Sequence, residues 1–188
     1  RSFPAEQAAL HGLAFVQASE DLRLRFWSLE AGGHLAMRHE LHAGREQLVA
    51  LDASADGAVV TGSKGFERSS CELAVWDTRT MEKRHSRCAF DNTIEAVRIV
   101  RRSAEVLQVV AASCDASVKC FTFPELEPLW EEASATAAPY TAIDVALGGG
   151  GRAVIFAATT APEVFVWCWG ATAGEPVPPD QPPLLCAR

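Results

Sequence analysis

The side chains best suited to chemistry lie in a short histidine-rich segment. His34, His39 and His42 carry imidazoles and Glu40 adds a carboxylate, a combination of groups that can bind zinc. His39 and His42 would share one face only in a helix, whereas the residues around them predict a strand followed by a turn. We therefore interpret this segment as a solvated outer strand and assign no metal ligand to it.

Other reactive residues do not fall into catalytic patterns. The sequence contains neither Gly-x-Ser-x-Gly nor His-Glu-x-x-His, and its six cysteines include no Cys-x-x-Cys pair. The glycines 148–151 are not followed by the Gly-Lys-Ser/Thr of a phosphate loop, so we interpret them as a hairpin turn. The sequence thus predicts a protein that is not an enzyme and needs no cofactor or metal.

Short apolar runs, repeated along the chain, are the elements that would position any site. The clearest run is Leu-Ala-Val-Trp-Asp at residues 73–77, and three other segments align with it on the aromatic residue without gaps. Each aligned segment has a branched aliphatic residue three positions before the aromatic residue. The four aromatic anchors are Trp27, Trp76, Phe121 and Trp167. They recur at intervals of 49, 45 and 46 residues, so the chain consists of repeats.

A hydroxyl residue also recurs before each anchor. Ser19, Ser113 and Thr159 each precede their anchor by eight positions, whereas Ser63 precedes Trp76 by thirteen. An insertion of five residues within the segment 64–70 explains this difference. We therefore expect one enlarged loop on an otherwise constant frame.

A period in the forties, with several short strands in each period, predicts an all-β propeller. A single small sheet cannot bury both faces, but copies stacked around an axis cover one another. The segment from about residue 11 to 169 resembles the WD-repeat (WD40) family, whose name-giving dipeptide is Trp76-Asp77. Asp21 and Asp115 match the family's turn aspartate, and we interpret both as turn-bracing residues. Residues other than aspartate follow the remaining three anchors.

Four blades are visible, and they divide the chain as follows. The predicted parts are a lead-in (1–9), four blades (10–46, 47–90, 91–136 and 137–170) and a proline-rich tail (171–188). The prolines of the tail predict that the last blade lacks a regular outer strand, with Leu184-Leu185 left as a docking point. The first blade also lacks a clear opening strand. Because unpaired strand edges bind other chains, we expect part of a larger propeller, or a half-propeller completed by a partner.

Composition narrows the class of partner. The net charge is −7 and the isoelectric point about 5.2, which argues against direct nucleic-acid binding. No apolar run is long enough to span a bilayer. Cysteines without a paired motif favour a reducing compartment, so an intracellular, cytoplasmic location is predicted, with the cilium, the cytoskeleton or another organelle as alternatives.

The resemblance implies a non-catalytic scaffold that mediates protein–protein interactions within a larger assembly. Ciliary, cytoskeletal or ribonucleoprotein complexes are the kinds of assembly in which this fold is used. The enlarged loop offers a contact patch in which Lys64 and Arg68 surround the aromatic Phe66. The alternative is a loop that contacts nothing and varies freely.

Two other functions stay open. Trp76, Asp77, Thr78 and Arg79 resemble the WD-x-R signature of substrate receptors for cullin-4 ubiquitin ligases, in which the arginine contacts the adaptor. Bracing of the turn by Asp77 and Arg79 is the simpler interpretation. A propeller enzyme with a central site is the third possibility, and the sequence offers no convergent acid, base or metal ligands for it.

Overall fold

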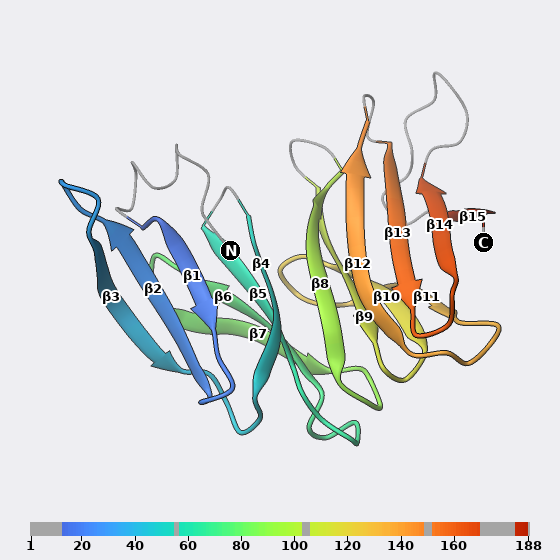
Figure 1. Ribbon diagram of the computed structural model, residues 1–188, viewed down its shortest axis with the longest axis horizontal. Helices are drawn as coiled ribbons and strands as arrows, with labels where there is room; N and C mark the ends of the chain where they lie inside the picture. The colour runs from blue at the N-terminus through green and yellow to red at the C-terminus, as the bar shows by residue number, and fades with distance from the viewer. Residues whose placement is uncertain (1–12, 55–56, 103–105, 149–151, 170–182, 188) are drawn as a thin grey trace. The chain divides into compact units, whose positions relative to one another are not determined.

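The computed structural model describes residues 13–54, 57–102, 106–148, 152–169 and 183–187, and all regular elements among them are β-strands. They form four antiparallel sheets in which consecutive strands pair, as Figure 1 shows, so the all-β prediction is confirmed. The lead-in, Asp56, Gly149–Gly151 and residues 171–182 of the tail lie outside the described residues. No helix in the described part is long and apolar enough to cross a membrane.

The first compact unit covers residues 1–94 and contains sheets A and B. Sheet A comprises β1 (Phe15–Ala18), β2 (Arg23–Leu29) and β3 (Leu35–His42). Sheet B comprises β4 (Leu48–Ala53), β5 (Ala58–Ser63), β6 (Glu72–Asp77) and β7 (Glu82–Cys88). Leu24 and Phe26 of sheet A are buried in one cluster with Val59, Ala74 and Trp76 of sheet B. Alternate residues of a strand point to opposite faces, so this core follows from the apolar spacing along each strand.

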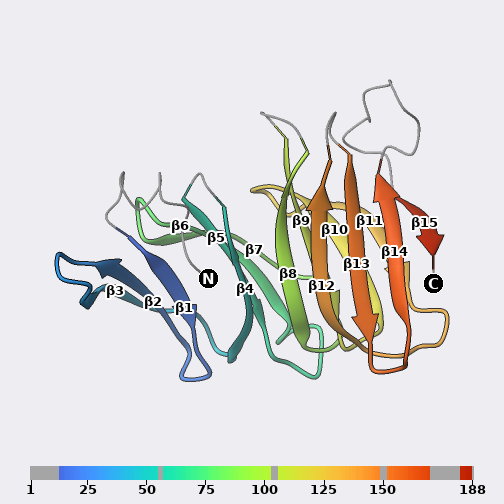
Figure 2. The same cartoon turned by 45° about the horizontal axis from the view of Figure 1, so that its top comes forward.

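The second compact unit covers residues 95–188 and contains sheets C and D. Sheet C comprises β8 (Ile94–Arg101), whose first residue belongs to the first unit, β9 (Leu107–Ser113), β10 (Ser117–Thr122) and β11 (Pro128–Ala133). Sheet D comprises β12 (Tyr140–Leu147), β13 (Ala153–Thr159), β14 (Val164–Trp169) and β15 (Leu184–Ala187), and Figure 2 shows these strands from a second direction. Val118 and Cys120 share a buried cluster with Ile155, Phe165 and Trp167.

The four sheets share one local irregularity. In each sheet, the pairing between the anchor strand and the strand that follows it shifts at the aromatic anchor. The shifts fall between Phe26 and Trp27, Val75 and Trp76, Cys120 and Phe121, and Val166 and Trp167. A β-bulge bends a strand and increases its twist. The aligned anchors therefore occupy matching positions in four similarly distorted sheets.

The prediction that the last blade lacks an outer strand is wrong. β15 pairs with β14, with Leu185 opposite Trp167 and Leu184 opposite Cys168. The prolines of the tail all precede β15 in the sequence, so none removes a backbone N–H from this strand. Leu184 and Leu185, predicted to be a docking point, lie within this strand with exposed side chains, and their docking role stays a prediction.

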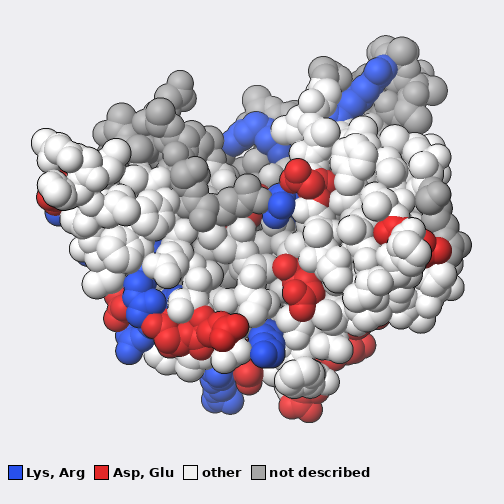
Figure 3. Space-filling model, in the orientation of Figure 1, with Lys and Arg blue, Asp and Glu red and all other residues white. Residues whose placement is uncertain are grey.

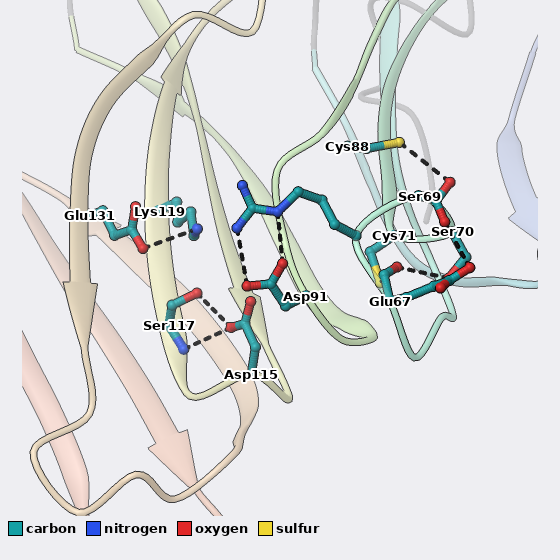
Figure 4. A network of polar contacts seen from close by, with 11 residues as sticks. Glu67, Ser69, Ser70, Cys71, Cys88, Asp91, Asp115, Ser117, Lys119 and Glu131 are labelled. Carbon is teal, nitrogen blue, oxygen red and sulfur yellow. Dashed lines mark hydrogen bonds and ion pairs between the residues drawn. The ribbon is translucent and has the colours of Figure 1, made fainter.

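The turns after β1 and β9 are held by the repeated hydroxyl and aspartate residues. Ser113 Oγ accepts a hydrogen bond from the backbone N–H of Asp115 at 3.1 Å. Asp115 Oδ1 accepts one from the N–H of Ser117 at 3.0 Å (Figure 4). Asp21 accepts the matching bond from the N–H of Arg23 at 3.2 Å. Both aspartates thus brace turns, as their positions predict.

Candidate functional site

The longest described turn of this kind is residues 64–71, which connect β5 to β6 of sheet B. The matching connections in the other sheets span residues 19–22, 114–116 and 160–163. The extra length lies where the spacing between Ser63 and Trp76 predicts an insertion. We call residues 64–71 the β5–β6 loop.

Hydrogen bonds close the base of the β5–β6 loop. Ser63 Oγ donates to the carbonyl of Ser70 and accepts from the N–H of Glu72, each at 2.7 Å. Thr93 Oγ1 donates to the carbonyl of Gly65 at 3.0 Å and accepts from its N–H at 3.2 Å. Ser63 and Thr93 are both buried, so these bonds are shielded from water.

The loop interior is organised around the carbonyl oxygen of Glu67. It accepts hydrogen bonds from the N–H of Ser70 at 3.0 Å, from Ser70 Oγ at 2.9 Å and from Cys71 Sγ at 3.1 Å. Ser69 Oγ donates to the carboxylate of Glu67 at 2.8 Å, and Figure 4 shows this group of side chains. With this many internal partners, the loop is held in one conformation.

Gly65 is needed for the close packing of the loop. A Cβ atom on Gly65 would lie 2.3 Å from Ser70 Oγ, 2.7 Å from Cys71 Sγ and 3.0 Å from the carbonyl carbon of Ser70. Such distances are shorter than van der Waals contact, so any larger residue would push the loop open.

An ion pair joins the loop to the segment before β8. Arg68 Nε and Nη2 contact the two carboxylate oxygens of Asp91 at 2.7 and 3.0 Å. Both side chains are more than half exposed, so the pair adds little stability, although its two parallel bonds fix the direction of the guanidinium.

Phe66 lies exposed on this ordered loop. Its side chain is 80% exposed, the largest value among the exposed large hydrophobic residues of the described part. Lys64, Glu67 and Arg68, also exposed, place charges of both signs around the ring. An aromatic residue with a polar rim is the composition of an interface hot spot. Because its loop is already ordered, the ring would bind with little loss of conformational entropy.

Asp77 and Arg79, the other predicted contact residues, have different environments. Asp77 Oδ1 accepts from the N–H of Arg79 at 2.7 Å and of Thr80 at 3.4 Å, and its second oxygen pairs with Arg84. Partial burial would raise the pKa of the Asp77 carboxyl, but these hydrogen bonds outweigh it and lower the pKa below the ordinary value. Asp77 therefore braces its turn as a carboxylate.

Arg79 contributes little to this turn through its side chain. Its Nη2 lies 3.9 Å from Asp77 Oδ2, and the side chain is 73% exposed. The guanidinium is therefore available to a partner. It follows the end of β6, whereas Phe66 precedes the start of the same strand, so the two predicted contact regions lie at opposite ends of β6.

The aromatic anchors are packed side chains of their sheets. The indole N–H of Trp76 donates to Thr61 Oγ1 at 2.9 Å within the core. The indole nitrogens of Trp27 and Trp167 are buried without a hydrogen-bond partner among the described residues. Trp167 stacks on Phe165 with ring centroids 5.7 Å apart, and Phe121 is fully buried.

Sequence reasoning missed Thr61, Thr93 and Asp91. Thr61 could have been recognised as a polar residue in an apolar run, two positions from Ser63. Thr93 and Asp91 are far from their loop partners in sequence, and neither the repeat nor local spacing points to them. Only the folded first unit brings these residues to the β5–β6 loop.

The histidine-rich segment and the buried cysteines are other reactive groups of the described residues. His39 and His42 lie on β3, and the described residues contain no group of three or more His, Cys, Asp or Glu that could hold a metal ion. Burial raises the pKa of the Cys114 thiol to about 11 and that of Cys120 to about 12. Both thiols are therefore protonated at neutral pH and are poor nucleophiles.

Charge on the surface also bears on the class of partner. On the face drawn in Figure 3, acidic and basic side chains are intermingled, and the described residues of this face form no continuous basic surface. A nucleic-acid backbone would require such a surface.

Comparison with known proteins identifies the fold. No protein-family model matches the chain, and no curated protein matches it. Among solved structures, Sqt1 of Saccharomyces cerevisiae, a WD40 protein, is similar with a TM-score of 0.69 and 14% identity over 94% of this chain. The chain spans 47% of the length of Sqt1.

A second similar structure is a computationally designed protein, Ika4. The TM-score is 0.64 at 17% identity, and the match covers 83% of this chain and 84% of Ika4. With the four antiparallel meanders, these similarities define an all-β fold of the WD40 β-propeller type. At such low identities, they concern the fold alone.

Proposed function

We propose that this protein is a non-catalytic WD40-repeat scaffold that binds another protein through the β5–β6 loop, as a subunit of a larger assembly. The observation that carries the proposal is the exposure of Phe66 on a loop closed by buried hydrogen bonds. A loop without a partner has no need for this bracing, and exposing a phenylalanine to water is unfavourable.

The partner surface follows from the chemistry of the loop. Phe66 requires an apolar pocket about the size of an aromatic ring. Lys64 and the Arg68–Asp91 pair would lie at the rim, where charges set orientation and association rate more than affinity. The partner is therefore a folded protein or an ordered peptide with a hydrophobic pocket and a mixed-charge rim.

The test is capture of interacting proteins from cells with three forms of the chain. The wild type is compared with Phe66→Ser and with Leu147→Ser, which changes another exposed apolar residue in the second unit. We expect a stoichiometric partner that is lost with Phe66→Ser and retained with Leu147→Ser. The proposal fails if the two variants retain the same partners in the same amounts.

A second candidate is a substrate receptor for a cullin-4 ubiquitin ligase, and the observation that favours it is the exposed guanidinium of Arg79 after Trp76-Asp77. In such a receptor Arg79 would contact the adaptor, at the end of β6 opposite to Phe66. Arg79→Ala should then abolish adaptor binding, while Arg152→Ala, a change to another exposed arginine, should not. Adaptor binding that is absent in the wild type, or equal in both variants, rejects this candidate.

A further inference from the structure

Two cysteines lie on neighbouring strands of sheet D. Cys168 belongs to β14 and Cys186 to β15, and these two strands pair antiparallel. Phe165, Trp167 and Trp169 of β14 point into the buried cluster of the second unit. Because Cys168 alternates with them along the strand, its side chain points to the other face of the sheet. Cys168 is half-buried there and Cys186 is exposed, so small molecules in solution can reach this pair.

The register shift between β14 and β15 brings the two thiols together. In an unbroken ladder Cys186 would lie opposite Val166, but Ala187 takes that position. Cys186 is therefore displaced along β15 toward Cys168, which lies opposite Leu184. The two thiols form a hydrogen bond with each other. This bond is the largest cause of the raised pKa of Cys168, followed by burial.

The two thiols differ in how readily they react. A thiol reacts as its thiolate, and the rate also depends on access. The raised pKa of Cys168 keeps its thiol protonated at neutral pH, and its side chain is half-buried. Cys186 is exposed, and its thiol donates only to the nearby carbonyl of Leu184, at 3.3 Å, among the bonds from Cys186 to the backbone. Cys186 is therefore the thiol that an oxidant in solution reaches first.

We propose that Cys168 and Cys186 form a reversible disulfide that fastens β15 to β14, with glutathione disulfide as the oxidant. The Cys186 thiolate attacks one sulfur of glutathione disulfide, which breaks that bond, forms a mixed disulfide and releases one glutathione. Cys168 then loses its proton and attacks the sulfur of Cys186, which releases the second glutathione. The two released thiolates take up the two protons, and the two electrons pass from the cysteines to glutathione. Excess reduced glutathione reverses both steps.

The bond would act on a strand that burial does not hold in place. All four residues of β15 are exposed, so its pairing with β14 is what attaches it to sheet D. Once β15 separates, the edge of β14 can pair with another strand, and a disulfide would prevent this. In the reducing compartment predicted from the sequence, disulfides are usually transient and respond to the redox state. The pair would therefore make the edge of sheet D sensitive to oxidation.

The first test treats the purified, reduced chain with mixtures of reduced glutathione and glutathione disulfide, and maps the products by peptide mass spectrometry. We expect the wild type to link Cys168 to Cys186. Cys88→Ser, which removes another exposed cysteine in the first unit, should form the same link. Cys168→Ser should stop at the mixed disulfide, so that Cys186 carries at least about tenfold more glutathione than in the wild type. Cys186→Ser should form no link to Cys168.

Hydrogen exchange measures what the disulfide does to the strand. In the oxidised wild type the amides of β15 should exchange at least about tenfold more slowly than in the reduced wild type, because the strand can no longer separate from β14. Cys168→Ser should show no such change with the same oxidant.

Three results would overturn the proposal. One is a wild type that accumulates the mixed disulfide on Cys186 to the same extent as Cys168→Ser, because Cys168 then does not react with it. Another is a wild type in which Cys186 links to a different cysteine. The third is equal exchange of the β15 amides in the oxidised and reduced wild type, which would show that the bond does not fasten the strand.

Discussion

At the scale of single residues, the four anchors occupy matching positions, but the three tryptophans among them differ in whether the indole N–H has a hydrogen-bond partner. Thr61 lies opposite Ala74 on the neighbouring strand and accepts the indole N–H of Trp76. The corresponding residue near Trp167 is Ala157, which has no hydroxyl to offer. An apolar period thus predicts the position of an anchor but not its hydrogen-bond partner.

Replacing Thr61 with valine tests the importance of this bond. The change keeps the shape of the side chain but leaves the indole N–H of Trp76 buried and unpaired. We expect the free energy of unfolding to fall by about 1–2 kcal/mol, measured by urea denaturation. Thr141→Val, at an exposed threonine that donates to the carbonyl of Ala158 at 3.3 Å, should change it by less than about 0.5 kcal/mol. Equal effects of the two changes would contradict this assignment.

The buried thiols predict a loss of stability in alkaline solution. Folding raises the pKa of Cys114 from 9.0 to about 11, and that of Cys120 to about 12, mainly through burial. Between pH 9 and 11 the unfolded chain therefore loses thiol protons that the folded chain retains, so the free energy of unfolding falls as the pH rises. Well below pH 9, where the thiols are protonated in both states, they contribute no pH dependence.

Urea denaturation of the wild type and of a Cys114→Ala/Cys120→Ala variant, from pH 7 to 10.5, measures this effect. The variant should show the shallower decline above pH 9. If the free energy of unfolding falls equally with pH in the two proteins, groups other than these thiols cause the loss of stability at alkaline pH.

At the scale of elements, the strands were predictable and the loop conformation was not. Apolar runs ending at Trp27, Trp76, Phe121 and Trp167 give the strand positions because burial on both faces requires such runs. The spacing before Trp76 predicts that the β5–β6 loop is enlarged. Its conformation depends on Thr93 and Asp91, which are distant in sequence and belong to no repeated pattern.

Strand β15 was not predicted from the sequence for a different reason. Its sequence, Leu-Leu-Cys-Ala, is too short to show a period, and the prolines before it suggest that pairing ends. Pairing with β14 is decided by the available edge of that strand, which is a tertiary property.

Gly65→Ala tests whether the braced conformation of the β5–β6 loop matters for binding. The added Cβ would lie 2.3 Å from Ser70 Oγ, so the loop must open although Phe66 is retained. We expect partner binding to weaken at least about tenfold, because an opened loop no longer holds the ring in place. The control is Gly148→Ala, whose Cβ would meet its nearest atom at an ordinary 3.5 Å. Unchanged binding by Gly65→Ala would mean that loop order is not required.

At the scale of the whole molecule, the chain consists of two units, each with its own core of two packed sheets. The WD40-type fold explains why strands with apolar residues on both faces occur in an acidic chain with a mean hydropathy near zero. Its rigid sheets present two separate exposed contacts at the ends of β6, Phe66 and Arg79. The fold alone does not indicate which of these two contacts binds a partner. The two candidate functions therefore require separate measurements.

The affinity of the purified chain for the partner captured by the wild type, measured by titration calorimetry, tests the central claim most directly. If Phe66 is the anchor of the interface, Phe66→Ala should weaken binding by about 2 kcal/mol, or about 30-fold, while Leu147→Ala changes it less than about twofold. An affinity of Phe66→Ala equal to that of the wild type would show that the β5–β6 loop is not the binding site.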